Sequence, residues 1–300
     1  MTITSEDLDA KYLPGFTREM LRIDGRGLRA LIGGAGPPVL LIHGDPQTHL
    51  CWRRIAPELA RARTVVLVDL PGRGESDPRA DMAGYAKASL AADMAAVMDQ
   101  LGFARFSLAG HDRGARVARR LALEYPDRVE ALAVMDIIPE GPFYAEADAQ
   151  IAQDYFYFFF LTQRAPLPER LIGGDPRAFM QDILDLTAGP GAYEPDILEH
   201  YLSAASRPAA VKAMCQCFRA GLQIDRVADH ADRQAGRRIT APTLVLWGAE
   251  GVVGQRFDVE PIWRSEAEQA RFQAMPAGHF LPEEAPRETL AALQAHLRSP

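Results

Sequence analysis

Apolar runs rich in β-branched residues recur along the chain and alternate with stretches of helical periodicity. The runs cover residues 37–44, 63–72, 105–110, 129–137, 241–248 and 270–278. Patterns of helical period separate most of them, at residues 52–62, 85–102 and 114–126. Nearly continuous apolar strands are what a parallel sheet needs when helices cover both of its faces. The alternation therefore predicts an α/β domain with a doubly wound, mostly parallel sheet.

This rhythm stops between about residues 140 and 235, where the sequence becomes aromatic and helical. The helical stretches there are IAQDYFYFFFLTQ, RAFMQDILDLT, PDILEHYLSAAS and PAAVKAMCQCFRAGL. Strand-like sequence resumes only after residues 237–240. One sheet domain with an inserted helical cap explains this order more economically than two successive domains. We therefore predict a core domain made of residues 1–139 and 236–300, with a helical cap at 140–235.

The composition argues against several kinds of partner. A formal net charge of −7 and a pI near 5.6 make general affinity for nucleic acid unfavourable. No uncharged apolar run approaches the roughly 20 residues that a membrane crossing needs. The polar, acidic start MTITSEDLDAKY lacks the pattern of a signal peptide. We expect a cytoplasmic protein that binds a small molecule and neither nucleic acid nor membrane.

The cysteines give no sign of disulfides or of a metal site. Cys51, Cys215 and Cys217 are an odd and sparse set, which fits a reducing compartment. Cys215 and Cys217 have the spacing of a ligand pair, but no second pair and no histidine at ligand spacing accompany them. We expect three buried, inert thiols and no metal ion.

The turn at residues 110–115, with the sequence GHDRGA, carries the strongest chemical signal. A strand that ends in a small residue, a polar residue at the tip and two small residues, and then runs into a helix, is typical of a nucleophile elbow. Asp112 is the residue at the tip, and Gly110, Gly114 and Ala115 let strand and helix approach. The alternative is that Asp112 only caps the following helix. The motif alone leaves both interpretations open.

A histidine near the C-terminus favours the catalytic interpretation. His279 lies in the turn after the last strand, as the base does in the chain order nucleophile, acid, histidine. Asp136 ends the strand that follows the elbow helix, which is a suitable place for the acid. The rival acids, Glu250, Asp258 and Glu260, follow a later strand in a stretch that reads as a flexible loop. We prefer Asp136.

The stretch HGDP at residues 43–46 follows another strand directly. In this architecture the residue after His-Gly donates a backbone N–H to an oxyanion hole, and the residue after the nucleophile donates a second. These residues are Asp45 and Arg113, and we expect His43 to be a structural hydrogen bonder. The Asp45 carboxylate would repel an anionic substrate unless it pairs with an arginine or turns to solvent.

An aspartate nucleophile sets the class of reaction. A carboxylate is already ionised and suits displacement at a saturated carbon, which leaves an alkyl ester on Asp112. Water activated by His279, with Asp136 orienting the imidazole, would then hydrolyse that ester. Haloalkanes, haloacids and epoxides are substrates that fit this chemistry, and it needs no cofactor.

Arginines on the elbow helix indicate one of these substrates. Arg113 and Arg116 are three residues apart and share a helix face, so together they would hold a substrate carboxylate. The alternative is a solvated helix with ordinary surface arginines. We accept that alternative for Arg119 and Arg120 but not for Arg113, which adjoins the nucleophile.

Several stretches taken together are typical of a known family. They are HGDPQTHLCWRRIAPELA, VVLVDLPGRGESD, AGHDRGARVARRLAL, MDIIP, APLPERLIGGDP and GHFLPEEAP. In them the chain resembles the haloacetate (fluoroacetate) dehalogenases of the α/β-hydrolase superfamily, which are relatives of the epoxide hydrolases. The resemblance covers nearly the whole chain. It implies Asp112 as nucleophile, His279 as base, Asp136 as its acid, Arg113 with Arg116 as carboxylate clamp, no cofactor, and a homodimer.

The expected leaving-group pocket departs from the family pattern. These dehalogenases hold the halide with a His-Trp pair and a Tyr of the cap, whereas this chain has Tyr157 and Phe158 in place of the pair and Phe218 in place of the Tyr. Fluoride needs strong hydrogen-bond donors to leave, so we expect chloroacetate or bromoacetate to be preferred over fluoroacetate. Epoxide hydrolases use two cap tyrosines. Phe218 replaces one of them, and Tyr155 or Tyr157 would be the other.

Three hypotheses follow from the sequence. The leading one is a hydrolytic dehalogenase of short 2-haloacids. The second is an epoxide hydrolase with an atypical cap. The third is a catalytically silent α/β-hydrolase-like protein whose aromatic cap binds an apolar ligand, which the presence of Asp112, Asp136 and His279 together disfavours.

Overall fold

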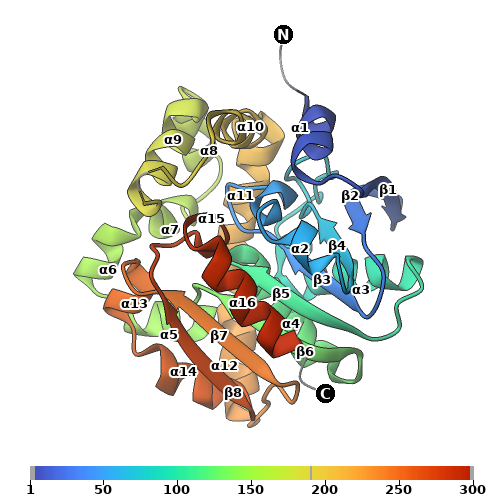
Figure 1. Cartoon of the computed structure of the whole chain (residues 1–300). Coiled ribbons are helices and arrows are strands. Elements are labelled where there is room, and N and C mark those ends of the chain that lie inside the picture. The colour runs from blue at the N-terminus through green and yellow to red at the C-terminus, as the bar shows by residue number, and fades with distance from the viewer. Residues whose placement is uncertain (1–3, 190, 298–300) are drawn as a thin grey trace.

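The protein is built on an eight-stranded sheet, which the computed structural model describes together with the helices for residues 4–189 and 191–297 (Figure 1). The strand order is β1-β2-β4-β3-β5-β6-β7-β8. The pairs β1/β2 and β2/β4 are antiparallel, and all other neighbours are parallel. The strands are β1 (Thr17–Ile23), β2 (Arg26–Gly33), β3 (Pro38–Ile42), β4 (Thr64–Val68), β5 (Phe106–His111), β6 (Val129–Met135), β7 (Thr243–Gly248) and β8 (Ala270–Met275).

The apolar runs of the sequence form the parallel part of this sheet, β3 to β8, so the predicted fold class is confirmed. The antiparallel hairpin of β1 and β2 was not predicted. Its strands carry arginines and a glutamate at many positions, because β1 lies at the edge of the sheet and is largely exposed. Charged residues are common on edge strands, where they discourage pairing with other chains, and they conceal the apolar pattern.

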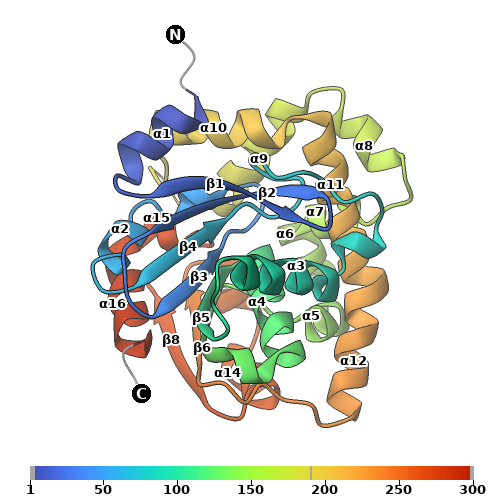
Figure 2. The same cartoon turned by 90° about the vertical axis from the view of Figure 1, so that its right-hand side faces the viewer.

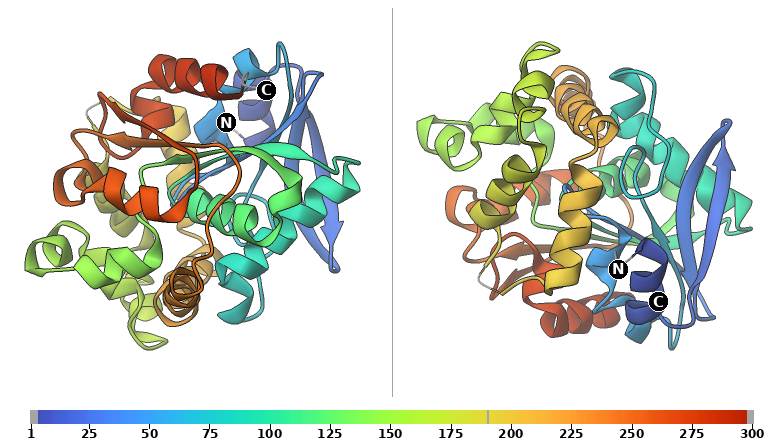
Figure 3. Two further views of the ribbon diagram at one scale, coloured as in Figure 1. Left: turned by 90° about the horizontal axis from the view of Figure 1, so that it is seen from below. Right: turned by 90° about the horizontal axis from the view of Figure 1, so that it is seen from above.

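Two helical layers enclose the sheet, and the side chains of the central strands alternate between them. Leu40 and Ile42 of β3 pack into one apolar cluster with α3 and α4, while Val39 and Leu41 pack into another with α1, α2 and α16. In the left view of Figure 3, α16 in red and the green helices α3 and α4 lie on opposite sides of the sheet. The helices of the core are α1 (Ser5–Tyr12), α2 (Ala56–Leu59), α3 (Lys87–Gln100), α4 (Arg113–Glu124), α13 (Val252–Arg256), α14 (Val259–Glu266), α15 (Leu281–Glu284) and α16 (Pro286–Leu297).

Between β6 and β7 the described residues form helices and no strand. This is the segment in which the sequence predicts a cap. Figure 2 shows α8, α9 and α10 above the sheet and α11 and α12 along one side of the molecule. The helices are α5 (Glu140–Glu146), α6 (Ala149–Asp154), α7 (Phe156–Leu161), α8 (Leu167–Ile172), α9 (Pro176–Thr187), α10 (Pro195–Ala205), α11 (Pro208–Ala220) and α12 (Arg226–Gln234), and a π-helical turn, η4 (Gly221–Asp225), joins the last two.

Two further sequence expectations can be compared with the structure. All three cysteines are buried and free, as expected. Within residues 4–189 and 191–297, no helix has the length and apolar character that a membrane crossing requires.

Candidate active site

Asp112 stands at a sharp turn between β5 and α4. Its backbone has φ 47° and ψ −120°, a conformation that residues with a side chain rarely adopt. The neighbouring glycines are required by close contacts. A Cβ atom on Gly110 would lie 2.5 Å from the carbonyl oxygen of Gly114, and one on Gly114 would lie 2.3 Å from that of Ile42. Asp112 makes no side-chain cap to the helix. The geometry is that of a nucleophile elbow rather than of a helix cap.

His279 lies between two carboxylates. Its Nδ1 is 2.6 Å from Oδ2 of Asp136, and its Nε2 is 3.9 Å from Oδ2 of Asp112. The other oxygen of Asp136 accepts a hydrogen bond of 2.9 Å from the backbone N–H of Gly248. Asp136 follows β6 directly and also has a positive φ, 51°. The structure thus brings together the three residues that sequence analysis grouped as nucleophile, base and acid.

The rival acids lie elsewhere. Glu250, Asp258 and Glu260 are all exposed, and Glu260 makes an ion pair with Arg264. None of the three contacts His279 through a hydrogen bond or ion pair among the described residues. Asp136 is therefore the carboxylate that orients the imidazole.

Asp45 faces the nucleophile with its backbone and faces away with its side chain. Its N–H donates a hydrogen bond of 2.9 Å to Oδ1 of Asp112. Its carboxylate makes two bonds to Arg73, of 2.7 and 2.6 Å, so its charge is paired. Arg113, the other expected oxyanion donor, is the first residue of α4. His43 bridges the Gly44 carbonyl and the Leu70 N–H, which makes it the structural hydrogen bonder expected from the sequence.

The electrostatics of the site keep Asp112 ionised. Burial by itself would raise the pKa of Asp112, but the charge of Arg113, the nearby histidines and the Asp45 N–H outweigh burial and hold this pKa below its usual range. For His279, burial favours a lower pKa, yet the hydrogen bond and charge of Asp136 and the charge of Asp112 raise the pKa above the ordinary value. The site therefore pairs an anionic nucleophile with a strengthened base.

Two residues that sequence analysis did not single out hold the His279 loop in place. Glu284 accepts hydrogen bonds from the N–H groups on both sides of His279, at 2.9 Å from Gly278 and 2.7 Å from Phe280. His111 is buried with its Nε2 2.8 Å from the His279 carbonyl oxygen, and burial lowers the pKa of His111 to about 3. A neutral imidazole donates this bond. The stretch GHFLPEEAP contained Glu284, but its spacing gave no sign of the contact.

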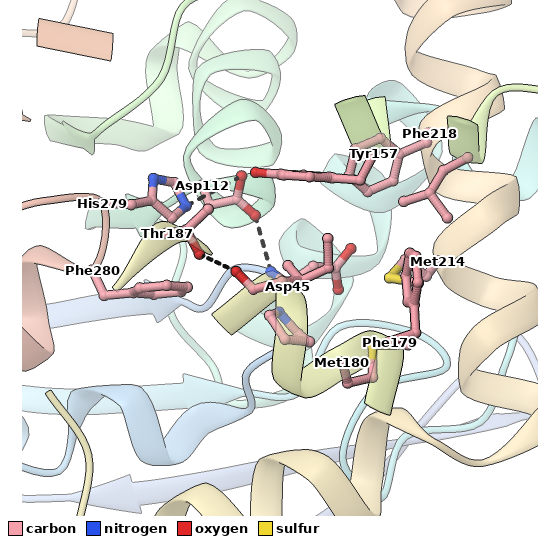
Figure 4. A pocket seen from close by; sticks show the side chains of 13 residues that line it. Asp45, Asp112, Tyr157, Phe179, Met180, Thr187, Met214, Phe218, His279 and Phe280 are labelled. Atoms are coloured by element: carbon pink, nitrogen blue, oxygen red, sulfur yellow. Dashed lines mark hydrogen bonds and ion pairs between the residues drawn. The ribbon is translucent and has the colours of Figure 1, made fainter. Parts of the chain in front are cut away.

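A small cavity lies above Asp112. The volume in it that the centre of a water molecule can occupy is about 20 Å3. Residues of the helical segment between β6 and β7 and residues outside it both contribute to its wall (Figure 4). The residues from that segment are mostly apolar. The lining residues are Asp45, Pro46, Asp112, Tyr157, Leu161, Phe179, Met180, Ile183, Thr187, Met214, Phe218, His279 and Phe280. Figure 4 shows the Tyr157 hydroxyl directed toward the carboxylate of Asp112.

Arg113 and Arg116, expected to clamp a substrate carboxylate, are not among the residues that line this cavity. Both guanidinium groups bind Glu140 instead, at 3.1 Å each. Sequence analysis did not single out Glu140. Arg119 and Arg120, which were expected at the surface, are buried and pair with Asp229. That expectation was wrong because α12 covers this part of α4.

The three residues of the expected leaving-group pocket have different positions. Tyr157 and Phe218 line the cavity. Phe158 does not, and instead packs on Phe218 with ring centroids 5.0 Å apart and lies over the guanidinium of Arg113, whose Cζ is 4.6 Å from its centroid. Among these three residues, only Tyr157 presents a hydrogen-bond donor.

Comparison with known proteins shows the family of the chain. The family model for the α/β hydrolase fold matches residues 37–286. A fluoroacetate dehalogenase from Burkholderia sp is 39% identical over 94% of this chain and 94% of that protein. The soluble epoxide hydrolase of Corynebacterium sp. (strain C12) is 30% identical over 90% of this chain and 93% of its own length.

The solved structures extend the similarity to the whole architecture. A candidate epoxide hydrolase from Pseudomonas aeruginosa superposes with a TM-score of 0.90 at 44% identity, over 95% of this chain and 96% of that one. The sequence comparison and the structural comparison thus agree on the family. The chain belongs to the α/β-hydrolase fold family, as a hydrolase related to the fluoroacetate dehalogenases and the epoxide hydrolases.

Proposed function

We propose that this protein hydrolyses small alkyl electrophiles through an ester formed on Asp112. The observation that carries the proposal is the position of His279, which is bound to Asp136 on one side and lies 3.9 Å from Asp112 on the other. This space beside the nucleophile admits a water molecule between base and ester.

In the first step, an oxygen of the Asp112 carboxylate attacks a saturated carbon and displaces the leaving group. The carboxylate loses its negative charge as the ester forms. In the second step, His279 takes a proton from water, and the oxygen of that water adds to the carboxyl carbon of Asp112. The N–H groups of Asp45 and Arg113 stabilise the oxyanion. Collapse of this intermediate expels the alcohol, which takes the proton from His279, and leaves Asp112 as a carboxylic acid. This acid then loses the second proton of the water, to the Tyr157 phenolate after epoxide opening or to solvent after halide release, which restores the carboxylate.

An uncharged substrate suits the cavity best. The described residues that line the wall include the ionised Asp112 and no lysine or arginine, and the carboxylate of Asp45 is paired with Arg73. A substrate carboxylate in that space would meet the like charge of Asp112. The cation beside Asp112 is Arg113, whose Nε is 3.7 Å from Oδ2 of Asp112, and this guanidinium is already shared with Glu140, so bringing in another anion is costly in a buried site. A short epoxide fits because the Tyr157 hydroxyl is available to donate to the oxygen that departs from carbon. Short epoxides are therefore the substrates that we propose first.

A second candidate is the dehalogenation of short 2-haloacids, and one specific observation favours it. Nε and Nη2 of Arg113 and Nε of Arg116 make no hydrogen bond to any described residue although they are buried. These N–H groups would donate hydrogen bonds to a substrate carboxylate if it reached them. Among Tyr157, Phe158 and Phe218, only Tyr157 would donate to a halide, so chloroacetate and bromoacetate would react faster than fluoroacetate.

The test compares substrates and traps the ester. Diol formation from propylene oxide and epichlorohydrin is measured beside halide release from fluoro-, chloro- and bromoacetate. Asp112→Asn should abolish both, and His279→Ala should accumulate a covalent adduct visible in the intact mass. The ester mechanism would be refuted if Asp112→Asn kept full activity and His279→Ala turned over substrate without forming an adduct. Ligand binding with no turnover of any substrate would support the silent binding protein.

A further inference from the structure

A buried carboxylate already occupies the arginine pair on α4. Glu140, the first residue of α5, is 2% exposed. Its Oε1 lies 3.1 Å from Nη1 of Arg113, and its Oε2 lies 3.1 Å from Nη1 of Arg116. The carboxylate thus lies between the two guanidinium groups, accepting a hydrogen bond from Arg113 and forming an ion pair without hydrogen-bond geometry with Arg116.

The surroundings of Glu140 are shaped around it. A Cβ atom on Gly221 would lie 2.8 Å from Oε1 of Glu140, so the absence of a side chain at the start of η4 leaves the space that this carboxylate fills. Lys87 lies 4.0 Å from the same oxygen and pairs with Asp225 at 3.0 Å. Three buried cations and two buried carboxylates therefore meet here, and the charge of Asp112 balances the remaining cation.

Aromatic rings cover much of this cluster on the side of the cavity, although Nε of Arg113 also lies 3.7 Å from Oδ2 of Asp112. The Cζ atom of Arg113 is 4.0 Å from the ring centroid of Phe218 and 4.6 Å from that of Phe158. The Cζ atom of Arg116 is 5.8 Å from the ring of Phe158. Phe218 forms part of the cavity wall, so Arg113 lies directly behind that wall. The positive charge near the nucleophile is present but neutralised and covered.

We propose that Glu140 is a specificity-determining residue, an internal carboxylate that occupies the arginine pair and thereby restricts the enzyme to uncharged substrates. The proposal deepens the proposed function and rests on Asp112 being the nucleophile of this site. A substrate carboxylate would have to displace Glu140, which would leave a buried acid without a partner. If it bound beside Glu140, a third carboxylate would join Glu140 and Asp112 around two arginines.

Glu140→Gln tests this because it removes the charge and keeps the shape. Asp229→Asn is the matched control, since Asp229 also bridges two buried arginines of α4, Arg119 and Arg120, and its loss changes the net charge by the same amount. Acetate is the probe, and acetamide is its uncharged counterpart. Binding of both is measured by calorimetry on the wild type and on each variant, and chloride release from chloroacetate is measured alongside.

We expect wild-type protein to bind acetate more weakly than acetamide. Glu140→Gln should bind acetate on the order of tenfold more tightly than the wild type, and its kcat/KM for chloroacetate should rise by a similar factor, because a like charge has been removed from a buried site. Acetamide binding should not change. Asp229→Asn should resemble the wild type with both probes.

Two results would overturn the proposal. One is wild-type protein that binds acetate at least as tightly as acetamide, and this measurement does not depend on whether a variant folds. The other is an equal effect of Glu140→Gln and Asp229→Asn. The binding measurement needs no chemistry, so failure of the ester mechanism, seen as absence of any adduct in His279→Ala, is distinguished from failure of the role of Glu140.

Discussion

Asp112 has a backbone conformation that favours glycine, and this strain lowers the free energy of unfolding by a measurable amount. With φ 47° its Cβ is crowded, and the carboxylate is buried as well. We predict that Asp112→Gly is more stable than Asp112→Ala by about 1 kcal/mol, because glycine relieves the strain and alanine keeps it. Both variants lack the carboxylate, so the comparison isolates the backbone. Urea unfolding at one pH gives the difference, and equal midpoints and slopes would contradict it.

The charge of Asp112 also acts on His279. Burial by itself favours a lower pKa for His279, and the carboxylates of Asp136 and Asp112 raise the pKa above the ordinary value. We predict a lower His279 pKa in Asp112→Asn, since one of the two anions is gone. The same loss of charge occurs when the ester forms, so the base becomes neutral, and able to take a proton, at a lower pH. NMR titration of the imidazole measures the shift.

Asp258→Asn is the control for this titration. It removes an exposed carboxylate and should leave the His279 pKa unchanged. A His279 pKa that stays the same or rises in Asp112→Asn would show that the nucleophile does not influence the base.

Chain order and strand ends were sufficient to predict Asp112, Asp136, His279 and the Asp45 backbone donor, because each directly follows a strand or the turn after one. Other site residues could not be predicted in this way. Glu140 reaches Arg113 and Arg116 only because α5 packs beside α4, and Arg73 reaches Asp45 across a loop. Such contacts depend on how separate segments approach, and no local pattern records them.

At the scale of elements, α7 supplies Tyr157, whose hydroxyl points toward the nucleophile (Figure 4). We predict that Tyr157→Phe slows epoxide opening by about 10²-fold, because the departing oxygen loses a proton donor. Hydrolysis of the preformed ester should be unaffected, since His279 and Asp136 perform it. Rapid-quench measurement of adduct formation and decay separates the two steps.

Tyr155→Phe is the matched control for this helix. Tyr155 precedes α7, is buried, and does not line the cavity above Asp112. Its loss should leave adduct formation close to that of the wild type. A larger effect from Tyr155→Phe than from Tyr157→Phe would assign the donor to Tyr155 instead.

At the scale of the whole molecule, a buried charge network ties the N-terminal helix to the sheet. The Nδ1 of His49 is 2.8 Å from Asp69, and its Nε2 is 2.8 Å from Asp9 of α1. Both ring nitrogens donate only when the imidazole is protonated. Burial opposes this charge, but the two carboxylates outweigh burial and raise the pKa of His49 to about 10.

This raised pKa predicts how stability depends on pH. The stabilisation of the folded state by protonated His49 is fully present below the pKa of an unfolded histidine, about 6.5. It is lost as pH rises toward 10, because the folded state then holds a proton that the unfolded state has released. The free energy of unfolding should therefore fall across this range. In His49→Gln, this fall should be reduced. Urea unfolding across the range tests it, and parallel curves for the two proteins would contradict it.

The overall architecture was largely predictable, and its exceptions have physical reasons. The strands buried on both faces gave a clear apolar signal, and the loss of alternation after residue 140 located the helices between β6 and β7. The hairpin of β1 and β2 gave no such signal because the edge strand β1 is largely exposed and both strands carry charged residues. The burial of Arg119 and Arg120 was missed because acids far along the chain, Asp229 and Glu266, neutralise them.

The cavity above Asp112 has one more consequence. Its open volume of about 20 Å3 is enough for a water molecule but for little more. We therefore expect a substrate larger than water to displace side chains such as those of Met180 and Met214 as it binds. The long, flexible side chains of methionine can make room in this way. We expect substrate entry and product release, rather than the chemical steps, to limit the turnover rate.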